Sequence, residues 1–368
     1  MISKFKKIVI KIGSSSIIDK KSKKIKLDWL KRISKDISTV HPQKKIIIVC
    51  SGAIALGSKF INDKKPIRRL EDKQAAAAVG QIELANYWQQ ILKKRKINTA
   101  QILLTLEDSE IRRRYLNVRK TINALHKQNI IPIINENDSV ATEEIRYGDN
   151  DRLAARVSQM VDADLLILLS NVDGLYSKRP IKNTDAKKIN DIFEINSAIE
   201  KMASSQSSDL GSGGMITKIW AAKICMNSGC STVITNSDKK NPLIGINKFN
   251  SSWFHASNSP KSNRKQWLLN HLHPSGTVFI DEGALKALKN NKSLLPAGVV
   301  EIKGRFSRGD IISILNTKNK KIGIGVIAYD SNDAKKIIGK NSKDIKNILG
   351  YEGRDELIHK DDLVKINQ

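Results

Sequence analysis

Two lysines stand where an ammonium group could meet a phosphate. Lys11 interrupts the apolar run of residues 8–12 and is followed by one glycine and three serines. Lys218 closes the glycine-rich segment 211–218, just before a helical pattern that runs to about Asn227. Glycine-rich turns expose backbone N–H groups, and the start of a helix adds a partial positive charge, so both segments suit an anion. Each lysine is therefore a candidate for binding a phosphate group.

Each segment also has an ordinary structural explanation. Lys11 could extend to solvent from an edge strand or a partly exposed strand. Residues 211–218 could form a flexible surface loop, since serines are dense at 204–208. The segment is not a Walker A loop, because Thr217 precedes Lys218 instead of following it. At the level of sequence these alternatives stay open.

Carboxylates and amides gather at two further points. Residues 135–138 (NEND) follow an apolar run that contains Pro132, and Asp149, Asn150 and Asp151 open a helical pattern. Such clusters can hold an ammonium group, a metal ion or both. Helix capping by Asp149 or Asn150 is the structural alternative, and it is compatible with a binding role.

A weaker signal lies at Cys50-Ser51-Gly52, where another β-rich run gives way to a helical pattern. Glycine at such a turn allows a ligand to approach the backbone closely. By itself this turn does not identify a site. The turn supports a site only because it repeats the arrangement after Lys11, in which small residues follow a strand.

The elements that would position these groups alternate between strand and helix. Leu27, Leu30, Ile33 and Ile37 show helical spacing, as do the apolar residues of 153–160. Strands are predicted at 7–12, 45–50, 99–105, 130–134, 164–169 and 232–235. Alternation of this kind is typical of a parallel sheet covered by helices on both faces, where ligands bind beyond the carboxyl ends of the strands.

A second region follows a stretch of turn formers between about 250 and 275, which we interpret as a linker. Short strands separated by Gly and Asn are predicted at 277–280, 299–302, 311–315 and 322–327, with helices at 283–290 and 331–338. This pattern favours a small β-barrel. The G-x-G-x-x-A string at 323–328 is interpreted as one of its strands, and 304–309 lacks the lysine of a P-loop.

Composition narrows the function classes. The 368 residues carry 64 Lys and Arg against 37 Asp and Glu, a net charge of +27. That excess makes nucleic acid, an anionic membrane surface or a phosphorylated substrate plausible, but the lysines are scattered, so lysine-rich codon usage is the simpler explanation. Three cysteines without a C-x-x-C pair argue against a disulfide framework and a zinc site, and no export signal or membrane span is evident. We expect a soluble cytoplasmic protein.

With these residues in hand, the chain resembles the amino acid kinase family and, within it, the glutamate 5-kinases of proline biosynthesis. The matching motifs are VIKIGSS at the start, SGAIALG at 51–57, NENDSVAT at 135–142, GDND at 148–151, GLY at 174–176 and GSGGMITK at 211–218. Residues 263–267 (NRKQW) also look like that family, and the C-terminal region resembles a PUA domain.

The resemblance implies a three-layer αβα sandwich with a mainly parallel sheet and a small C-terminal β-barrel. The implied domains are a catalytic domain at 1–258, a linker at 259–275 and a PUA domain at 276–368. The implied reaction moves the γ-phosphoryl group of ATP to the γ-carboxylate of L-glutamate. A carboxylate is already ionised at pH 7, so this nucleophile needs no general base, and the lack of a convincing catalytic histidine is expected.

The resemblance also implies roles for individual residues. Lys11 and Lys218 would bind the phosphates, with Asp151 holding both ammonium groups, and Asp138 would take the substrate ammonium. Asn171 stands where family members commonly have Asp. The implied glutamate-binding residues are Ser51, Asp138 and Asn150. The implied ATP-binding residues are Lys11, Ser170, Asn171, Ser212, Gly213, Gly214, Met215, Ile216, Thr217 and Lys218.

The cofactors implied are ATP and Mg²⁺, with the metal held mainly by ATP oxygens and water because no dense carboxylate cage is visible. Proline is the implied inhibitor, through a site overlapping the glutamate pocket, and a homo-oligomer, dimer or tetramer, is the implied assembly. Two rival interpretations remain: another carboxylate kinase of the same fold, and an RNA-binding protein acting through its PUA domain. Against the second, aromatic residues make up only 5% of the chain and do not interleave with the basic residues.

Overall fold

The computed structural model describes residues 2–19, 21–61, 69–140, 150–178, 185–205, 214–258 and 274–365. The chain divides into two compact units, Met1–Pro260 and Lys261–Gln368. Most of the linker predicted from the sequence, residues 259–273, lies outside the described residues. Within the described part, every helix is too short or too polar to cross a lipid bilayer.

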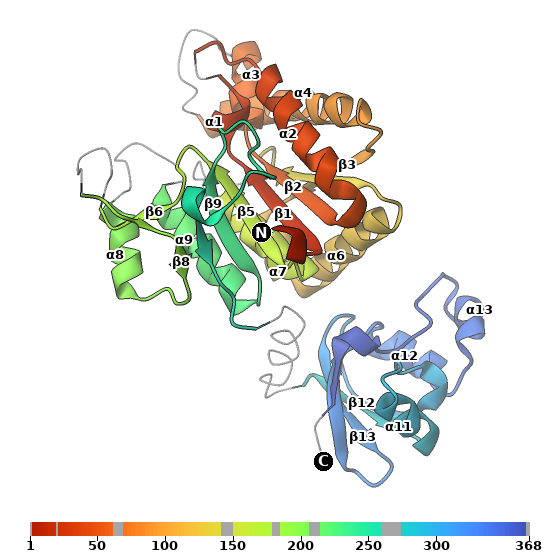
Figure 1. Ribbon diagram of the computed structural model, residues 1–368. Coiled ribbons are helices and arrows are strands. Elements are labelled where there is room, and N and C mark those ends of the chain that lie inside the picture. The colour runs from red at the N-terminus through yellow and green to blue at the C-terminus, as the bar shows by residue number, and fades with distance from the viewer. Residues whose placement is uncertain are drawn as a thin grey trace. The chain divides into compact units, whose positions relative to one another are not determined.

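An eight-stranded sheet forms the centre of the first unit, in the order β3-β4-β2-β1-β5-β9-β10-β8 (Figure 1). Its strands are β1 (Lys7–Ile12), β2 (Lys45–Cys50), β3 (Thr99–Leu104), β4 (Ile131–Glu136), β5 (Leu165–Ser170), β8 (Asp191–Ile192), β9 (Ser231–Asn236) and β10 (Ser251–Phe254). Every neighbouring pair is parallel except β9 and β10. The mainly parallel sheet expected from the sequence is confirmed.

Helices cover both faces of this sheet. They are α1 (Ser14–Ile17), α2 (Leu27–Val40), α3 (Ala53–Ile61), α4 (Leu70–Lys93), α5 (Leu106–Glu110), α6 (Arg112–Lys127), α7 (Asn150–Val161), α8 (Ser197–Ser205) and α9 (Met215–Asn227). A separate two-stranded ribbon joins β6 (Leu175–Tyr176) to β7 (Lys188–Ile189). One core lies between the sheet and α2, α3 and α4, and a second core lies between the sheet and α6, α7 and α9. The three-layer αβα arrangement follows.

The central strand β1 shows how the two cores share one sheet. Ile8, Ile10 and Ile12 belong to the core on the α2 and α4 side. Val9 belongs to the core on the α7 and α9 side. Successive side chains of a strand point to opposite faces, so Lys11 lies on the same face as Val9. This places its side chain toward α7 and α9.

The predicted strands of this unit are confirmed to within two residues, with three corrections. β4 runs to Glu136, so Asn135 and Glu136 lie inside the strand instead of following it. Leu27, predicted on the buried face of its helix, is 50% exposed at the first position of α2. The interpretation of Ser251 and Ser252 as turn formers is wrong, because both are buried in β10.

The second unit is built on a five-stranded sheet in the order β12-β11-β13-β14-β15. Its elements are β11 (Gly276–Ile280), α11 (Glu282–Lys289), β12 (Val299–Gly304), β13 (Ile311–Asn316), β14 (Lys321–Val326), α12 (Ser331–Ile337), α13 (Ile345–Leu349) and β15 (Leu363–Lys365). The four predicted strands and two predicted helices are confirmed; β15 and α13 were not predicted. The G-x-G-x-x-A string lies mostly in β14, inside this five-stranded sheet and not in a nucleotide-binding turn.

Candidate active site

One buried carboxylate brings the two lysines together. Asp151, in the first turn of α7, is fully buried. Its Oδ1 lies 2.7 Å from the Nζ of Lys11 on β1, and its Oδ2 lies 3.2 Å from the Nζ of Lys218 in α9. The Thr217 hydroxyl is 2.9 Å from the same Oδ2. Three elements from distant parts of the sequence thus converge on one side chain.

The position of Lys11 excludes the structural alternative for this residue. β1 lies between β2 and β5, so Lys11 is on a central strand, and its exposed fraction is only 7%. A lysine that extends to solvent from an edge strand would not be buried in this way. A Cβ built at Gly13 would lie 3.8 Å from the Lys11 Nζ, so the ammonium group sits directly beside the turn that follows β1.

Electrostatics keep this cluster charged. Burial by itself would raise the pKa of Asp151, but the ammonium groups of Lys11 and Lys218 and the Thr217 hydroxyl lower that pKa to about 2. Burial lowers the pKa of Lys218, and the Asp151 carboxylate acts in the opposite direction. One carboxylate between two ammonium groups leaves a net positive charge, which suits an anionic ligand at the carboxyl ends of the strands.

The first residue of α7 connects the helix to the end of β2. The Asn150 amide nitrogen donates to the Cys50 carbonyl oxygen at 2.8 Å and to the Ser51 hydroxyl oxygen at 2.7 Å. Asn150 and Ser51, predicted as glutamate-binding residues, are therefore in direct contact. Its neighbour Asp149, the other residue considered for helix capping, lies outside the described residues.

Asp138 follows β4 in a half-buried turn at the same edge of the sheet. Burial raises the pKa of its carboxyl group to about 6. No ion pair to this carboxylate is present among the residues that the structure describes. A partly desolvated carboxylate of this kind suits a cationic ligand group. Within those same residues, no hydrogen bond or ion pair joins Asp138 to Ser51 or Asn150.

The predicted nucleotide segment is seen in part. Gly214 precedes the first turn of α9, Met215 is buried, and Ile216 is 45% exposed. Ser212 and Gly213 lie outside the described residues. Ser170 is buried at the end of β5, and its hydroxyl lies 3.2 Å from Oδ1 of Asn171, which is exposed.

Metal-binding side chains are scarce at this edge of the sheet. Across the described residues, no three His, Cys, Asp or Glu side chains gather as a set of metal ligands. Asp151 is already engaged by two ammonium groups. These residues therefore do not fit a metal ion held by the protein itself.

Two parts of the chain match known protein families. Residues 6–236 match the amino acid kinase family, and residues 276–349 match the PUA domain. The chain is 51% identical to the glutamate 5-kinase of Agrobacterium fabrum over 360 residues, covering 97% of this chain and 92% of that protein. It is 47% identical to the glutamate 5-kinase of Paramagnetospirillum magneticum over 361 residues, covering 98% and 97%. The chain belongs to the glutamate 5-kinase family.

Membership of the glutamate 5-kinases makes this chain a kinase with a PUA domain. Among solved structures it is also similar to a UMP kinase from Ureaplasma parvum, with 17% identity, a TM-score of 0.48, and coverage of 68% of this chain and 98% of that one.

Sequence reasoning did not predict the link between Ser16 and Ser237. Ser16, in α1, donates its hydroxyl to that of Ser237 at 2.8 Å, and both are buried. The backbone nitrogen of Ser237 also donates to the Ser170 carbonyl oxygen at 2.7 Å, and its carbonyl accepts from the Trp29 indole at 2.8 Å. Ser237 thus ties the turn after β1 to the end of β5. Ser16 belongs to the serine run after Gly13, but nothing in the sequence connects it to Ser237, so only the structure could reveal this link.

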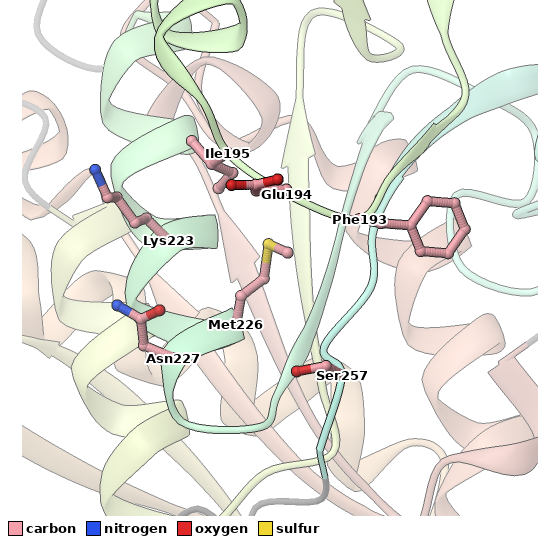
Figure 2. Close-up of a pocket in the computed structure, with 7 residues that line it drawn as sticks. All are labelled: Phe193, Glu194, Ile195, Lys223, Met226, Asn227 and Ser257. Atoms are coloured by element: carbon pink, nitrogen blue, oxygen red, sulfur yellow. The ribbon is translucent and has the colours of Figure 1, made fainter.

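A separate cavity of about 220 Å³ lies between the last turns of α9 and the segment after β8 (Figure 2). It is lined by Phe193, Glu194, Ile195, Lys223, Met226, Asn227 and Ser257. None of the predicted site residues lines it. Lys223 donates to Glu200 at 2.7 Å, so its charge is already paired.

Proposed function

We propose that this chain transfers the γ-phosphoryl group of ATP to the γ-carboxylate of L-glutamate, forming γ-glutamyl phosphate and ADP. A carboxylate oxygen forms a new bond to the γ-phosphorus, and the bond from that phosphorus to the β–γ bridging oxygen breaks. Its electron pair leaves on ADP. Two observations support this assignment: the relatives are named glutamate 5-kinases, and the chain matches the amino acid kinase family.

The observation that carries the proposal is the Lys11–Asp151–Lys218 cluster. Phosphoryl transfer needs placement of the reacting groups and neutralisation of charge that spreads over the transferring group. Two ammonium groups fixed on opposite oxygens of one carboxylate can place the phosphates and neutralise their charge. Asp151 holds the lysines in position and favours their charged forms, while the lysines contact the phosphates.

The remaining site residues are proposed to hold the substrates. Asp138 takes the glutamate ammonium, Ser51 and Asn150 complete that pocket, and main-chain N–H groups after Gly52 take the α-carboxylate. Ser170, Asn171 and the segment up to Lys218 bind the nucleotide. Mg²⁺ enters with ATP, held by triphosphate oxygens and water, because the described residues offer it no carboxylate set.

The reaction is proposed as the first step of proline biosynthesis in the cytoplasm. Proline is proposed as a feedback inhibitor, because it shares the α-carboxylate and an α-nitrogen with glutamate and so fits an overlapping site. Assembly into a homo-oligomer remains a prediction. RNA binding by the PUA domain also remains a prediction, because positive charge alone binds RNA without regard to its sequence. Regulation or assembly is the role we favour for the second unit.

The test is ATP-dependent formation of γ-glutamyl hydroxamate by the purified protein in the presence of L-glutamate and hydroxylamine. Product is expected with glutamate and not without ATP. Aspartate and N-acetylglutamate, offered in parallel, test the alternative of another carboxylate kinase. Faster turnover of either one than of glutamate would overturn the assignment.

A further inference from the structure

Gln81, on helix α4, ends a chain of side-chain hydrogen bonds that begins at the carboxyl end of β2. The Asn150 amide nitrogen lies 2.8 Å from the Cys50 carbonyl oxygen, 2.7 Å from the Ser51 hydroxyl oxygen and 3.0 Å from Asn135 Oδ1. The Asn135 amide nitrogen in turn donates to Gln81 Oε1 at 2.6 Å. Asn135 was predicted only as a member of the 135–138 cluster, and Gln81 was not predicted at all.

The Cys50 carbonyl fixes the direction of every bond in this chain. A backbone carbonyl can only accept, so Asn150 turns its NH₂ group toward it. An amide NH₂ group can only donate, so the Ser51 hydroxyl and Asn135 Oδ1 are both acceptors. The group has two hydrogens for three oxygens, so one hydrogen is shared between two of these acceptors. The Asn135 amide then faces α4 with its NH₂ group, which requires an acceptor there.

This direction decides which atoms remain for a ligand. Asn150 uses its nitrogen on the protein, so its Oδ1 is the atom left to accept from a ligand. Ser51 accepts from Asn150, so its own O–H is left to donate. An α-amino acid carries an ammonium donor and a carboxylate acceptor, and this pair of groups complements both.

We propose that Gln81 is a positioning residue for glutamate binding, whose Oε1 holds Asn135, and through it Asn150, in the orientation that presents an acceptor to the substrate ammonium. If Asn135 flipped, its NH₂ group would face the NH₂ group of Asn150, and the two donors would repel. The inference rests on the proposed function, because it assigns Asn150 to the glutamate pocket.

The test compares two substitutions at one position. Gln81→Met keeps the length of the side chain but removes the acceptor, whereas Gln81→Glu keeps an acceptor facing Asn135 and removes the amide donor. Gln81→Met should raise the glutamate KM about fivefold to thirtyfold, as expected for the loss of one partly buried hydrogen bond, with the ATP KM unchanged. Gln81→Glu should stay within about twofold of the wild-type KM.

Gln90→Met is the matched control, because Gln90 is an exposed glutamine on the same helix whose side chain donates to Asn86 Oδ1 at 3.2 Å. It should leave both KM values unchanged. Thermal unfolding of all three variants shows that each is folded. An equal rise in KM for Gln81→Glu and Gln81→Met, or no rise for Gln81→Met, would overturn the proposal.

Glutarate, which lacks the α-ammonium group, supplies a second readout. Gln81→Met should change the KM for glutarate much less than the KM for glutamate, and an equal loss for both would contradict the orientation argued above. Failure of the proposed function has a different signature: the wild-type protein would then make no hydroxamate from glutamate at all. If the wild type is active and the Gln81 variants keep its glutamate KM, only the role of Gln81 is contradicted.

Discussion

Lys11 and Lys218 contact opposite oxygens of the same buried carboxylate, at 2.7 Å and 3.2 Å. One lysine comes from strand β1 and the other from helix α9. Leaving either ammonium group unpaired in this position would be costly, because a buried charge needs a partner. The shared carboxylate therefore keeps two positive groups close together without an anionic ligand.

Lys218→Ala should lower kcat about a hundredfold or more and change the glutamate KM little, because we propose that this charge is used mainly in the transition state. Steady-state kinetics with glutamate and ATP varied separately measure both quantities. Lys223→Ala is the control, since Lys223 lies on the same helix but pairs with Glu200 at the surface. A Lys218→Ala enzyme with wild-type turnover would contradict the role assigned to this lysine.

Asp151→Asn should shift the alkaline limit of activity to lower pH. Burial already lowers the pKa of Lys218, and Asp151 opposes that effect. Without the carboxylate the lysine loses its proton at a lower pH, so activity declines earlier as the pH rises. A pH profile of kcat from 6 to 10 checks this; an unchanged alkaline limit would show that Asp151 does not sustain the charge.

The same carboxylate should affect stability in acid. The pKa of Asp151 is about 2 in the folded protein against an ordinary value of 3.8, so its ionised form stabilises the fold above pH 4. That contribution is lost as the pH falls from about 4 to 2. The wild-type thermal midpoint should therefore approach that of Asp151→Asn over this window, and parallel curves would contradict the linkage.

Glutamate binding should weaken as the pH falls from 7 to 5. The pKa of Asp138 is raised to about 6, so its carboxylate takes up a proton in this window and no longer attracts an ammonium group. Asp138→Asn should raise the glutamate KM at pH 7 about tenfold or more and remove the pH dependence. Ser139→Ala, at the exposed neighbouring position, should do neither.

Asp138→Asn should also stabilise the protein at neutral pH. Because burial raises the folded pKa from 3.8 to about 6, the ionised form costs stability above pH 6, and that cost disappears as the pH falls through 6 toward 4. We expect a gain of about 1 to 2 kcal/mol at pH 7, discounted for partial exposure. Urea unfolding of the two proteins at pH 7 and pH 5 measures it, and a larger gain at pH 5 would contradict the sign.

Ser237→Ala should raise the ATP KM about fivefold with the glutamate KM unchanged. The substitution leaves the buried Ser16 hydroxyl without its partner and loosens the turn after β1. Adding Ser16→Ala should recover stability, because no orphaned hydroxyl remains, yet the ATP KM should stay high. Ser38→Ala on the surface of α2 serves as the control. If the double variant had the wild-type ATP KM, the Ser16–Ser237 hydrogen bond would affect stability alone and not ATP binding.

Several features of the fold were predictable because they depend on local patterns. The β-branched runs predicted β1, β2 and β5 nearly to the residue, since a strand buried on both faces requires continuous apolar residues. β10 was missed because serines are typical of turns. In the structure its two serines are buried with their hydroxyls bonded to backbone carbonyls, one to Asn247 and one to Ile189. Tertiary partners thus outweighed local propensity.

The sequence by itself determined the class of fold and the residue types of the site, because periodicity and glycine-rich turns are written along the chain. It also placed Lys11 in a strand, but it placed Lys218 just before a helix, whereas α9 already begins at Met215 and includes Lys218. Only the tertiary structure decided that both meet Asp151, that Ser16 pairs with Ser237, and that Gln81 reaches Asn135. Hydrogen bonds and ion pairs act over a few ångströms in space, and separation along the chain carries no information about that distance.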